Sequence, residues 1–348
     1  MDRGLPSGSW TGYRPARLPV RASPLARAGA HLLPYAAAAR GRYFSSGVDR
    51  ALCRALHDAA RARTLYRFGP PPPLRLSAQR DAHDAYAFRS PFASPWRARN
   101  DACAQLHREP SGRRALVVVN VVGHSLTRWV LVRTTVTALR ARGLDVAVPV
   151  APGGGSRRTP EDRRLGWAHS VGAALVALVQ LVHDNVALES WARELGYGTI
   201  IVTGLGLGGT VAAVLAATTS RFDAYVPVVA GAHPGRLWMP PRPLARAVHA
   251  GALARGGLRS RRALARLFDP VAPNRLPPPR ARERCLVVGL RYDPLVPVDD
   301  VRDLGTHWGV EPRWIARGGV ELGRWPRELA AMIATFVARR ARLAAAAS

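Results

Sequence analysis

The chain has 348 residues, of which 48% are hydrophobic, so it can form one large domain or two smaller ones with a substantial core. Its 51 basic residues are all arginine and outnumber 23 acidic residues, which gives a formal net charge of +28. The lack of lysine indicates a coding bias, and the arginines are spread over termini, helices and loops rather than clustered with aromatic residues. This pattern argues against a nucleic-acid partner, although the positive field would attract anionic membranes or RNA.

The three cysteines and the first 44 residues bear on where the protein works. The cysteines are few and widely spaced, with neither a disulfide nor a zinc pattern, which indicates a reducing compartment. No apolar run reaches the ~18–20 residues that a membrane-spanning helix needs. The stretch Arg42-Tyr-Phe-Ser-Ser46 resembles the end of a mitochondrial presequence. We therefore expect a cytoplasmic protein, with the mitochondrial matrix as the alternative if residues 1–44 are a presequence.

In chain order, residues 1–80 come first and read as an Arg/Pro-rich extension with one short helix at 48–63. An alternating pattern follows. We predict an edge strand at 85–90, strands at 114–122, 145–150, 199–203, 223–229, 284–290 and 313–316, and helices at 126–142, 163–194, 211–217, 298–308 and 326–342. Apolar strands that alternate with amphipathic helices predict an α/β fold, a mostly parallel twisted sheet with helices on both faces. A helical insertion at 240–268 interrupts the pattern.

Residues 203–209 read TGLGLGG and join a predicted strand to an alanine-rich helix. Their glycines fit the G-x-G-x-x-G turn of a dinucleotide-binding fold, and equally a G-x-S-x-G nucleophile elbow with glycine in place of serine. A dinucleotide turn follows the first strand and needs an acidic residue after the next one. Here the turn follows the third parallel strand, and Asp223 precedes its strand. The elbow is therefore the better interpretation, and we expect no cofactor.

The elbow interpretation predicts where its partners stand. In α/β-hydrolases the nucleophile, the acid and the histidine follow successive strands in that chain order. Asp293 follows the predicted strand 284–290, and its Asp-x-x-Val-Pro loop resembles the loop usual there; the last strand then leads to Gly-Gly-Val320, where the family has Gly-Gly-His. Residues 85–342 thus resemble an α/β-hydrolase domain with a cap-like insertion at 240–268, similar to bacterial and mitochondrial abhydrolase-domain proteins. Further likenesses are Phe88-x-Ser-Pro, Arg128-Trp, Trp191-x-x-Glu-x-Gly-Tyr and Leu237-Trp238.

The resemblance implies a degenerate triad, because Gly206 takes the place of the nucleophile and Val320 that of the base, while Asp293 retains the acid. A hydroxyl is a weak nucleophile until a positioned base accepts its proton, so losing both ends of the relay removes this chemistry. The implied oxyanion or ligand-binding donors are Leu207 after the elbow and the altered loop at Val122, Gly123 and His124.

The sequence therefore favours a pseudo-hydrolase that binds a small acyl, lipid-like, acidic or protein ligand without turning it over. Two alternatives stay open: an active ester or amide hydrolase with a non-standard nucleophile, and a basic scaffold or nucleic-acid-associated protein on the same fold. The arginine-rich insertion would suit an acidic ligand, an anionic membrane surface or a protein partner, or would be a solvated lid helix. The oligomeric state is left open.

Other polar residues receive structural roles. We expect helix-start, surface or boundary positions rather than catalysis for Ser125, His169, Ser170, His233 and His307. Asp299, Asp300 and Asp303 begin a predicted helix, where carboxylates favour the positive end of the dipole. No His, Cys and carboxylate set has metal-ligand spacing, so no metal is expected.

Overall fold

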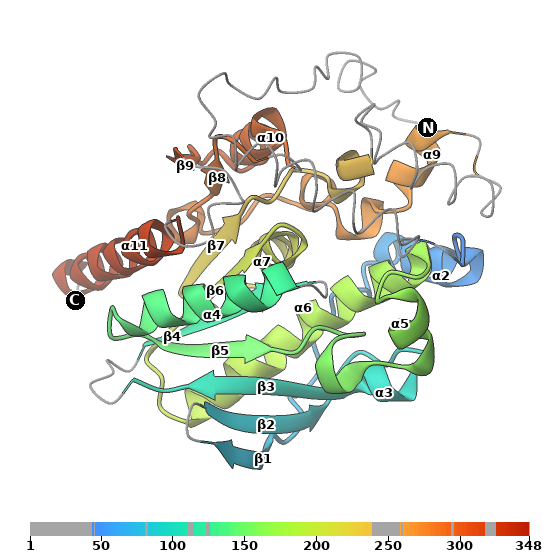
Figure 1. Ribbon diagram of the computed structural model, residues 1–348. Helices are drawn as coiled ribbons and strands as arrows, with labels where there is room; N and C mark the ends of the chain where they lie inside the picture. The colour runs from blue at the N-terminus through green and yellow to red at the C-terminus, as the bar shows by residue number, and fades with distance from the viewer. Residues whose placement is uncertain are drawn as a thin grey trace.

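The computed structural model describes residue 44 and residues 46–80, 83–109, 115–122, 126–238, 258, 260–293, 296–316 and 325–347. Within these residues, one sheet of nine strands runs in the order β1-β2-β3-β5-β4-β6-β7-β8-β9 (Figure 1). In chain order the strands are β1 (Arg75–Arg80), β2 (His83–Arg89), β3 (Asp101–His107), β4 (Ala115–Val121), β5 (Asp145–Pro149), β6 (Thr199–Leu205), β7 (Ala224–Val228), β8 (Val288–Leu290) and β9 (Arg313–Ile315). The six strands from β4 to β9 pair in parallel, and β1, β2 and β3 add antiparallel pairs. The prediction of a mostly parallel α/β sheet is confirmed.

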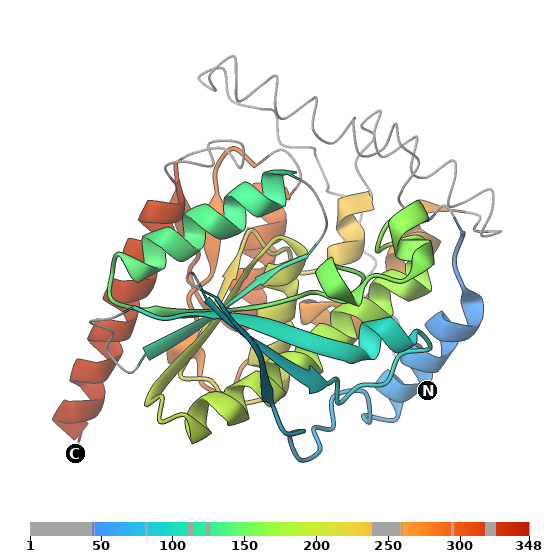
Figure 2. The same cartoon turned by 60° about the horizontal axis from the view of Figure 1, so that its bottom comes forward.

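Helices cover both faces of this sheet (Figure 2). The longer helices are α2 (Arg50–Arg61), α4 (Leu126–Arg140), α6 (Val171–Glu194), α7 (Leu207–Thr218), α10 (Val298–Trp308) and α11 (Trp325–Ala347). Helices α4 and α11 pack together over one face, whereas α6 and α7 lie on the other, with α2 outside α6. The helices therefore enclose the apolar strands from both sides, and loops at the carboxyl ends of the parallel strands remain to form a site.

Helix α6 is apolar around nearly its whole circumference, as expected of a helix in the middle of a core. It is long and apolar enough to cross a membrane, but its most apolar stretch is 100% buried inside the fold. Among the described residues it is the one helix that meets this length and composition test.

Several predicted boundaries were wrong. The helix predicted over 163–194 is two helices, α5 (Pro160–Leu165) and α6, because Gly166 between them has a φ of 94° and interrupts the helical backbone. Thr159 and Ser170 then cap the two amino-terminal ends. The predicted edge strand at 85–90 is the inner strand β2, flanked by β1 and β3, which the sequence pattern did not reveal.

The strand predicted over 284–290 is shorter than expected, since only Val288–Leu290 form β8 and Cys285 makes a single bridge to Tyr225. The amino-terminal segment also differs from a loose extension. From Phe44 onward it contributes Val48, Leu56 and Leu65 to the core. Of the predicted insertion at 240–268, the described part is residue 258 and residues 260–268, which include the short helix α9 (Arg261–Arg266).

Candidate functional site

The turn after β6 has the backbone of a nucleophile elbow. Strand β6 ends at Leu205, Gly206 stands alone with φ 56° and ψ −115°, and α7 begins at Leu207. The Gly206 amide donates to the Val228 carbonyl of the neighbouring strand at 3.0 Å. Positive φ is a conformation that residues with a side chain adopt only under strain. The strand, strained turn and helix follow one another as the elbow interpretation requires.

Three of the four glycines of this turn, Gly204, Gly206 and Gly208, have different roles, which a hypothetical Cβ atom at each position makes clear. At Gly204 a Cβ would lie 2.3 Å from the Gly208 carbonyl oxygen, and at Gly208 it would lie 2.1 Å from the Asn120 carbonyl oxygen. At Gly206 it would meet no atom within 4 Å. The outer glycines are needed for close backbone packing, whereas the central position has room for a side chain that glycine does not provide.

The structure describes two of the four predicted donor residues, Leu207 and Val122. Leu207 is the first residue of α7, and the first bond inside this helix runs from the Thr210 amide to the Gly206 carbonyl at 2.9 Å. Amides before that first bond point out of a helix end and suit an anion or a carbonyl oxygen. Val122 follows β4 directly and is half-buried, while Gly123 and His124 lie outside the described residues.

The predicted acid follows β8. Asp293 Oδ1 accepts a hydrogen bond from the Val296 amide at 2.8 Å, which holds the loop that leads to α10. Because β6 and β8 are parallel strands of one sheet, Gly206 and Asp293 stand at the same carboxyl edge. Val320 lies outside the described residues, so its place relative to these two stays a prediction.

A buried pair of amides joins the strands beside the elbow, and sequence reasoning missed it. The side chains of Asn120 on β4 and Asn185 on α6 exchange two hydrogen bonds, at 2.9 and 2.8 Å. Asn120 also donates to the Thr203 carbonyl on β6 at 3.1 Å, and Asn185 donates to the Leu181 carbonyl at 2.7 Å. A closed polar network in an apolar interior fixes relative positions, here the ends of the two strands that frame the elbow. The one polar residue in the run Ala115–Val121 was the available signal.

The histidine at 233 was predicted at the surface or a boundary, but it is buried, with 1% exposure. Its Nδ1 accepts from the Gly235 amide at 3.0 Å, so its Nε2 carries the proton and donates to Asp269 at 2.8 Å. Desolvation lowers the pKa of this histidine, against the opposing effect of Asp269. Both ring nitrogens are committed to bonds within the fold, so neither is free to take a proton from a substrate. His307 likewise lies against the Leu276 carbonyl, at 3.0 Å.

The acidic cluster at the start of α10 is more than a response to the helix dipole. Asp300 is 1% exposed and accepts from Arg236 at 2.7 Å, and the same guanidinium binds Asp303. Desolvation raises the pKa of Asp300 to about 6, although Arg236 opposes the shift. Gly231 is required beside it, since a Cβ there would lie 1.7 Å from Asp300 Oδ2. This cluster joins the segment after β7 to the helix after β8.

A second network fixes the loops between β2 and α6, and no periodic pattern in the sequence indicates it. Arg99 pairs with Asp162, and Arg157 pairs with Asp184 at 2.6 Å, with all four side chains at most 1% exposed. Arg99 also donates to the carbonyls of Ala173 and Trp167, and Ser90 donates to Asp184 at 2.6 Å. Every charge is therefore paired and hydrogen-bonded, which buried charges require.

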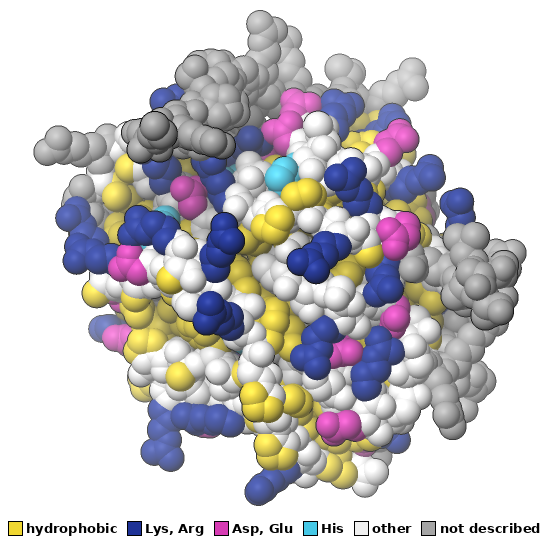
Figure 3. Space-filling view, turned by 180° about the vertical axis from the view of Figure 1, so that it is seen from behind, with side chains coloured by type: hydrophobic (Ala, Val, Ile, Leu, Met, Phe, Trp, Pro, Cys, Tyr) yellow, Lys and Arg dark blue, Asp and Glu magenta, His cyan; other side chains and the backbone are white. Residues whose placement is uncertain are grey.

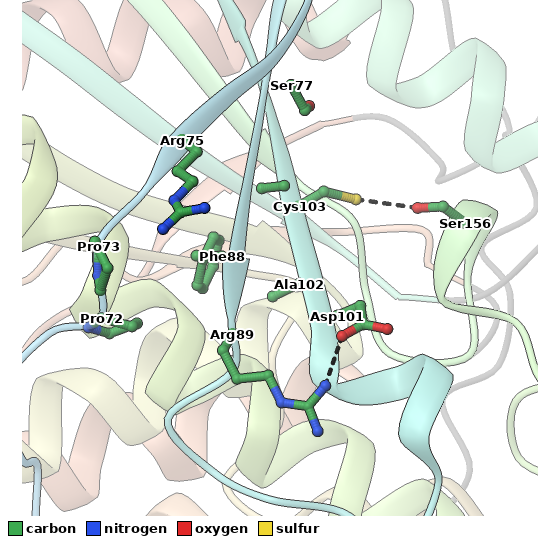
Figure 4. Close-up of a pocket in the computed structure, with 11 residues that line it drawn as sticks. Pro72, Pro73, Arg75, Ser77, Phe88, Arg89, Asp101, Ala102, Cys103 and Ser156 are labelled. Carbon is green, nitrogen blue, oxygen red and sulfur yellow. Dashed lines mark hydrogen bonds and ion pairs between the residues drawn. The ribbon is translucent and has the colours of Figure 1, made fainter.

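A groove of about 620 Å³ lies across β1, β2 and β3, on other strands than the elbow (Figure 4). Its centre is lined by Ala87 and Cys103, which are cross-strand neighbours, and Cys103 Sγ lies 3.2 Å from Ser156 Oγ. At one end Arg89 pairs with Asp101 at 2.6 Å, and both side chains are more than half exposed. The groove is open, and the charges of Arg89 and Asp101 on its rim offset each other. We therefore regard the elbow, and not this groove, as the candidate reaction centre.

Metal ligands, cysteines and surface charge complete the description of the polar side chains. Those residues contain no group of three or more His, Cys, Asp or Glu side chains arranged to hold a metal ion. The three cysteines are free thiols. Figure 3 shows arginines distributed over one face of the molecule and mixed with acidic side chains.

The part of the chain that matches a known family contains the elbow. Residues 136–235 match the family described as "Alpha/beta hydrolase domain containing 18", a stretch that runs from α4 past the elbow to the segment after β7. The chain belongs to the α/β-hydrolase superfamily. The match is to 100 of 348 residues, so it places the superfamily rather than the individual family. No curated protein matches the chain significantly in sequence.

Solved structures of the superfamily resemble the chain at low identity. An esterase from Pyrococcus furiosus is 15% identical, with 77% of this chain and 98% of that one covered and a TM-score of 0.48. A serine hydrolase homologue from Coxiella burnetii is 15% identical, with 74% and 99% covered and a TM-score of 0.44. A candidate dipeptidyl aminopeptidase IV from Bacteroides ovatus is 12% identical over 77% of this chain, with a TM-score of 0.48, and the chain spans only 36% of its length.

Proposed function

We propose that this protein is a non-catalytic α/β-hydrolase that binds a small acyl or other carbonyl-containing ligand at the elbow. The observation that carries the proposal is Gly206, which has the positive-φ backbone of a nucleophile position and open space where the nucleophile's side chain would stand. The fold has kept the turn and its close glycine packing without the reactive group.

The chemistry explains why the remaining parts are insufficient for acyl transfer. Attack on a carbonyl needs a nucleophile whose proton passes to a base, and the acid serves to orient that base. Glycine has no side chain to attack with, and valine at the expected base position 320 accepts no proton. Asp293 instead binds the backbone of its own loop through Val296.

The parts that remain suit binding. The amide of Leu207 lies at the amino-terminal end of a 12-residue helix, whose dipole favours the partial negative charge of a carbonyl oxygen. The Asn120–Asn185 pair holds the strand that leads to the second donor loop. Because position 206 has no side chain, an acyl group bound at the Leu207 amide would meet no nucleophile from that position.

A test of binding can remove the donor without removing the helix. Leu207 is the first residue of α7, a position where proline is tolerated, so Leu207→Pro deletes the amide hydrogen while Leu207→Ala keeps it. Titration of the protein with octanoate, followed by amide NMR, should shift the Leu207 signal of the unmutated protein. We expect affinity to fall about tenfold or more in Leu207→Pro, the loss of one well-made hydrogen bond, and to persist in Leu207→Ala. Equal affinity in both variants would contradict binding at this amide, and so would an unmoved Leu207 signal in the unmutated protein.

A further inference from the structure

His169 lies at the junction of α5 and α6, and its buried ring has no hydrogen-bond partner. It is 4% exposed, and neither ring nitrogen has a hydrogen bond. Buried polar atoms are nearly always bonded, so an imidazole with two free nitrogens calls for an explanation. The indole of Trp96 stands edge-on to the ring, with 5.7 Å between centroids. The site therefore suits a neutral ring and offers little to a charged one.

Four charged groups act on His169 from the elements around it. Nε2 lies 3.8 Å from Glu161 Oε2 and 4.0 Å from Asp162 Oδ1, both on α5. Asp49 at the start of α2 also favours the charged ring, whereas Arg99 on α3 (Arg97–Asn100) opposes it. Desolvation is the largest effect and lowers the pKa of His169 overall.

The carboxylates of Asp162 and Glu161 do not offset the desolvation of a protonated His169, because of the contacts they already make. Asp162 is already bound to the Arg99 guanidinium, in a pair with both side chains 0% exposed. Glu161 is 52% exposed, so water screens its attraction. A proton on His169 would therefore be stabilised only by admitting water or by moving a neighbour.

The neighbour that lies on the His169 backbone is a strap formed by Phe44 and residues 46–48. The Phe44 amide donates to the Ala168 carbonyl at 2.8 Å, and the Ser46 amide donates to the His169 carbonyl at 2.8 Å. In return the carbonyls of Gly47 and Val48 accept from the first two amides of α6, Val171 at 3.1 Å and Gly172 at 3.0 Å. The strap thus supplies backbone caps to the buried helix of the core.

We propose that His169 is a proton-sensitive latch that keeps the strap docked while the ring is neutral and releases it when the ring is protonated. The proton enters at a ring nitrogen and gives an imidazolium that the closed site does not solvate. Undocking of the strap opens the backbone next to the ring to water. Because the folded-state pKa is below that of the open state, docking is complete above the open-state value of about 6.5 and weakens as pH falls below it.

Release of the strap would also affect residues that pack against α7, the helix after the elbow. The Phe44 ring packs on Phe268, with 6.3 Å between centroids. Phe268 directly precedes the short turn Asp269–Val271, which packs against α2, α6 and α7. Since α7 is the helix that begins after Gly206, acid would loosen the wall next to the proposed ligand site. The latch rests on contacts independent of that ligand and can be tested without it.

Hydrogen exchange at the strap tests this proposal. In the full-length protein, protection of the Phe44 and Ser46 amides, corrected for the intrinsic pH effect, should fall about tenfold per pH unit below pH 6.5 until the folded-state pKa is reached. His169→Phe keeps a ring without a titratable group and should remove this dependence. Glu161→Gln removes an attraction for the charged ring at an exposed position and so lowers the folded-state pKa of His169 further. The fall in protection should then begin at the same pH but continue to lower pH and become larger in total.

The matched control is His183→Phe. It replaces another buried histidine of lowered pKa, on α6, whose Nε2 donates to the Leu65 carbonyl and not to the strap. The strap's pH dependence should survive in this variant. The proposal is overturned by strap protection that does not change with pH in the unmutated protein, or by the same dependence in His169→Phe. If His169→Phe does not fold, a total fall in strap protection that is no larger in Glu161→Gln than in the unmutated protein overturns it.

Discussion

Two regions at the carboxyl edge of the sheet contrast in what their side chains provide. The network of Arg99, Asp162, Arg157 and Asp184 is complete, with every charge paired inside the core. The elbow has kept its backbone but presents glycine where a reactive group would stand. The core network therefore has its side-chain contacts complete, whereas position 206 of the elbow has no side chain at all.

The largest expected effect on stability comes from breaking the buried ion-pair network. Arg157→Leu leaves Asp184 buried with Ser90 as its remaining partner, so we expect a loss of about 3–5 kcal/mol in the free energy of unfolding. Urea unfolding measures it. Arg89→Leu is the matched control, because its pair with Asp101 is exposed and should change stability by less than about 1 kcal/mol. Similar losses in both variants would contradict the importance of burial.

Substitutions at the elbow glycines Gly206 and Gly208 should differ in how much stability they cost. Gly208→Ala places a methyl group against the Asn120 carbonyl, and we expect a loss of about 3 kcal/mol or more. Gly206→Ala meets open space and adds only the strain of a positive φ, about 1–2 kcal/mol. Thermal and urea unfolding of both variants tests the order. A larger loss at 206 than at 208 would show that the central position is not open.

Stability should depend on pH through Asp300, whose pKa is raised to about 6. A raised pKa means that the fold favours the protonated carboxyl, so this contribution is present below about pH 4 and is lost as pH rises to about 6. Asp300→Asn imitates the protonated group and should lack this slope. Relative to the variant, the unmutated protein should lose at most about 3 kcal/mol of unfolding free energy between pH 4 and pH 7. Parallel pH profiles for the two proteins would exclude the effect.

The smallest expected effect on stability concerns Arg63, a residue with positive φ outside the elbow. It tests whether the backbone is strained there too. Arg63 is exposed after α2 and has a φ of 55°. Arg63→Gly should stabilise the protein by about 0.5–1 kcal/mol, because glycine adopts this conformation without strain. Arg67→Gly is the control at a nearby position without positive φ and should destabilise slightly. A lower melting temperature in Arg63→Gly would contradict the prediction.

The sequence revealed the parallel sheet and the elbow because both have local patterns. Runs such as 115–119 are apolar at every residue, and the turn at 203–209 is recognisable from its glycines. It did not reveal β1 and β3, whose mixed polar and apolar residues resemble loops until the sheet pairs them. Nor did it reveal the Arg99–Asp162 pair or the orphaned His169, because these depend on residues that only the fold brings together. Spacing predicts which residues share an edge, but contacts decide which of them are bonded.

The central claim is that the elbow of the unmutated protein carries no nucleophile. The most direct measurement is reaction of the full-length protein with a fluorophosphonate probe and p-nitrophenyl esters, followed by intact-mass and absorbance readings, beside the Gly206→Ser/Val320→His variant. We predict no covalent adduct and no ester turnover above background for the unmutated protein. An adduct on the unmutated protein, or turnover that the probe abolishes, would contradict the account.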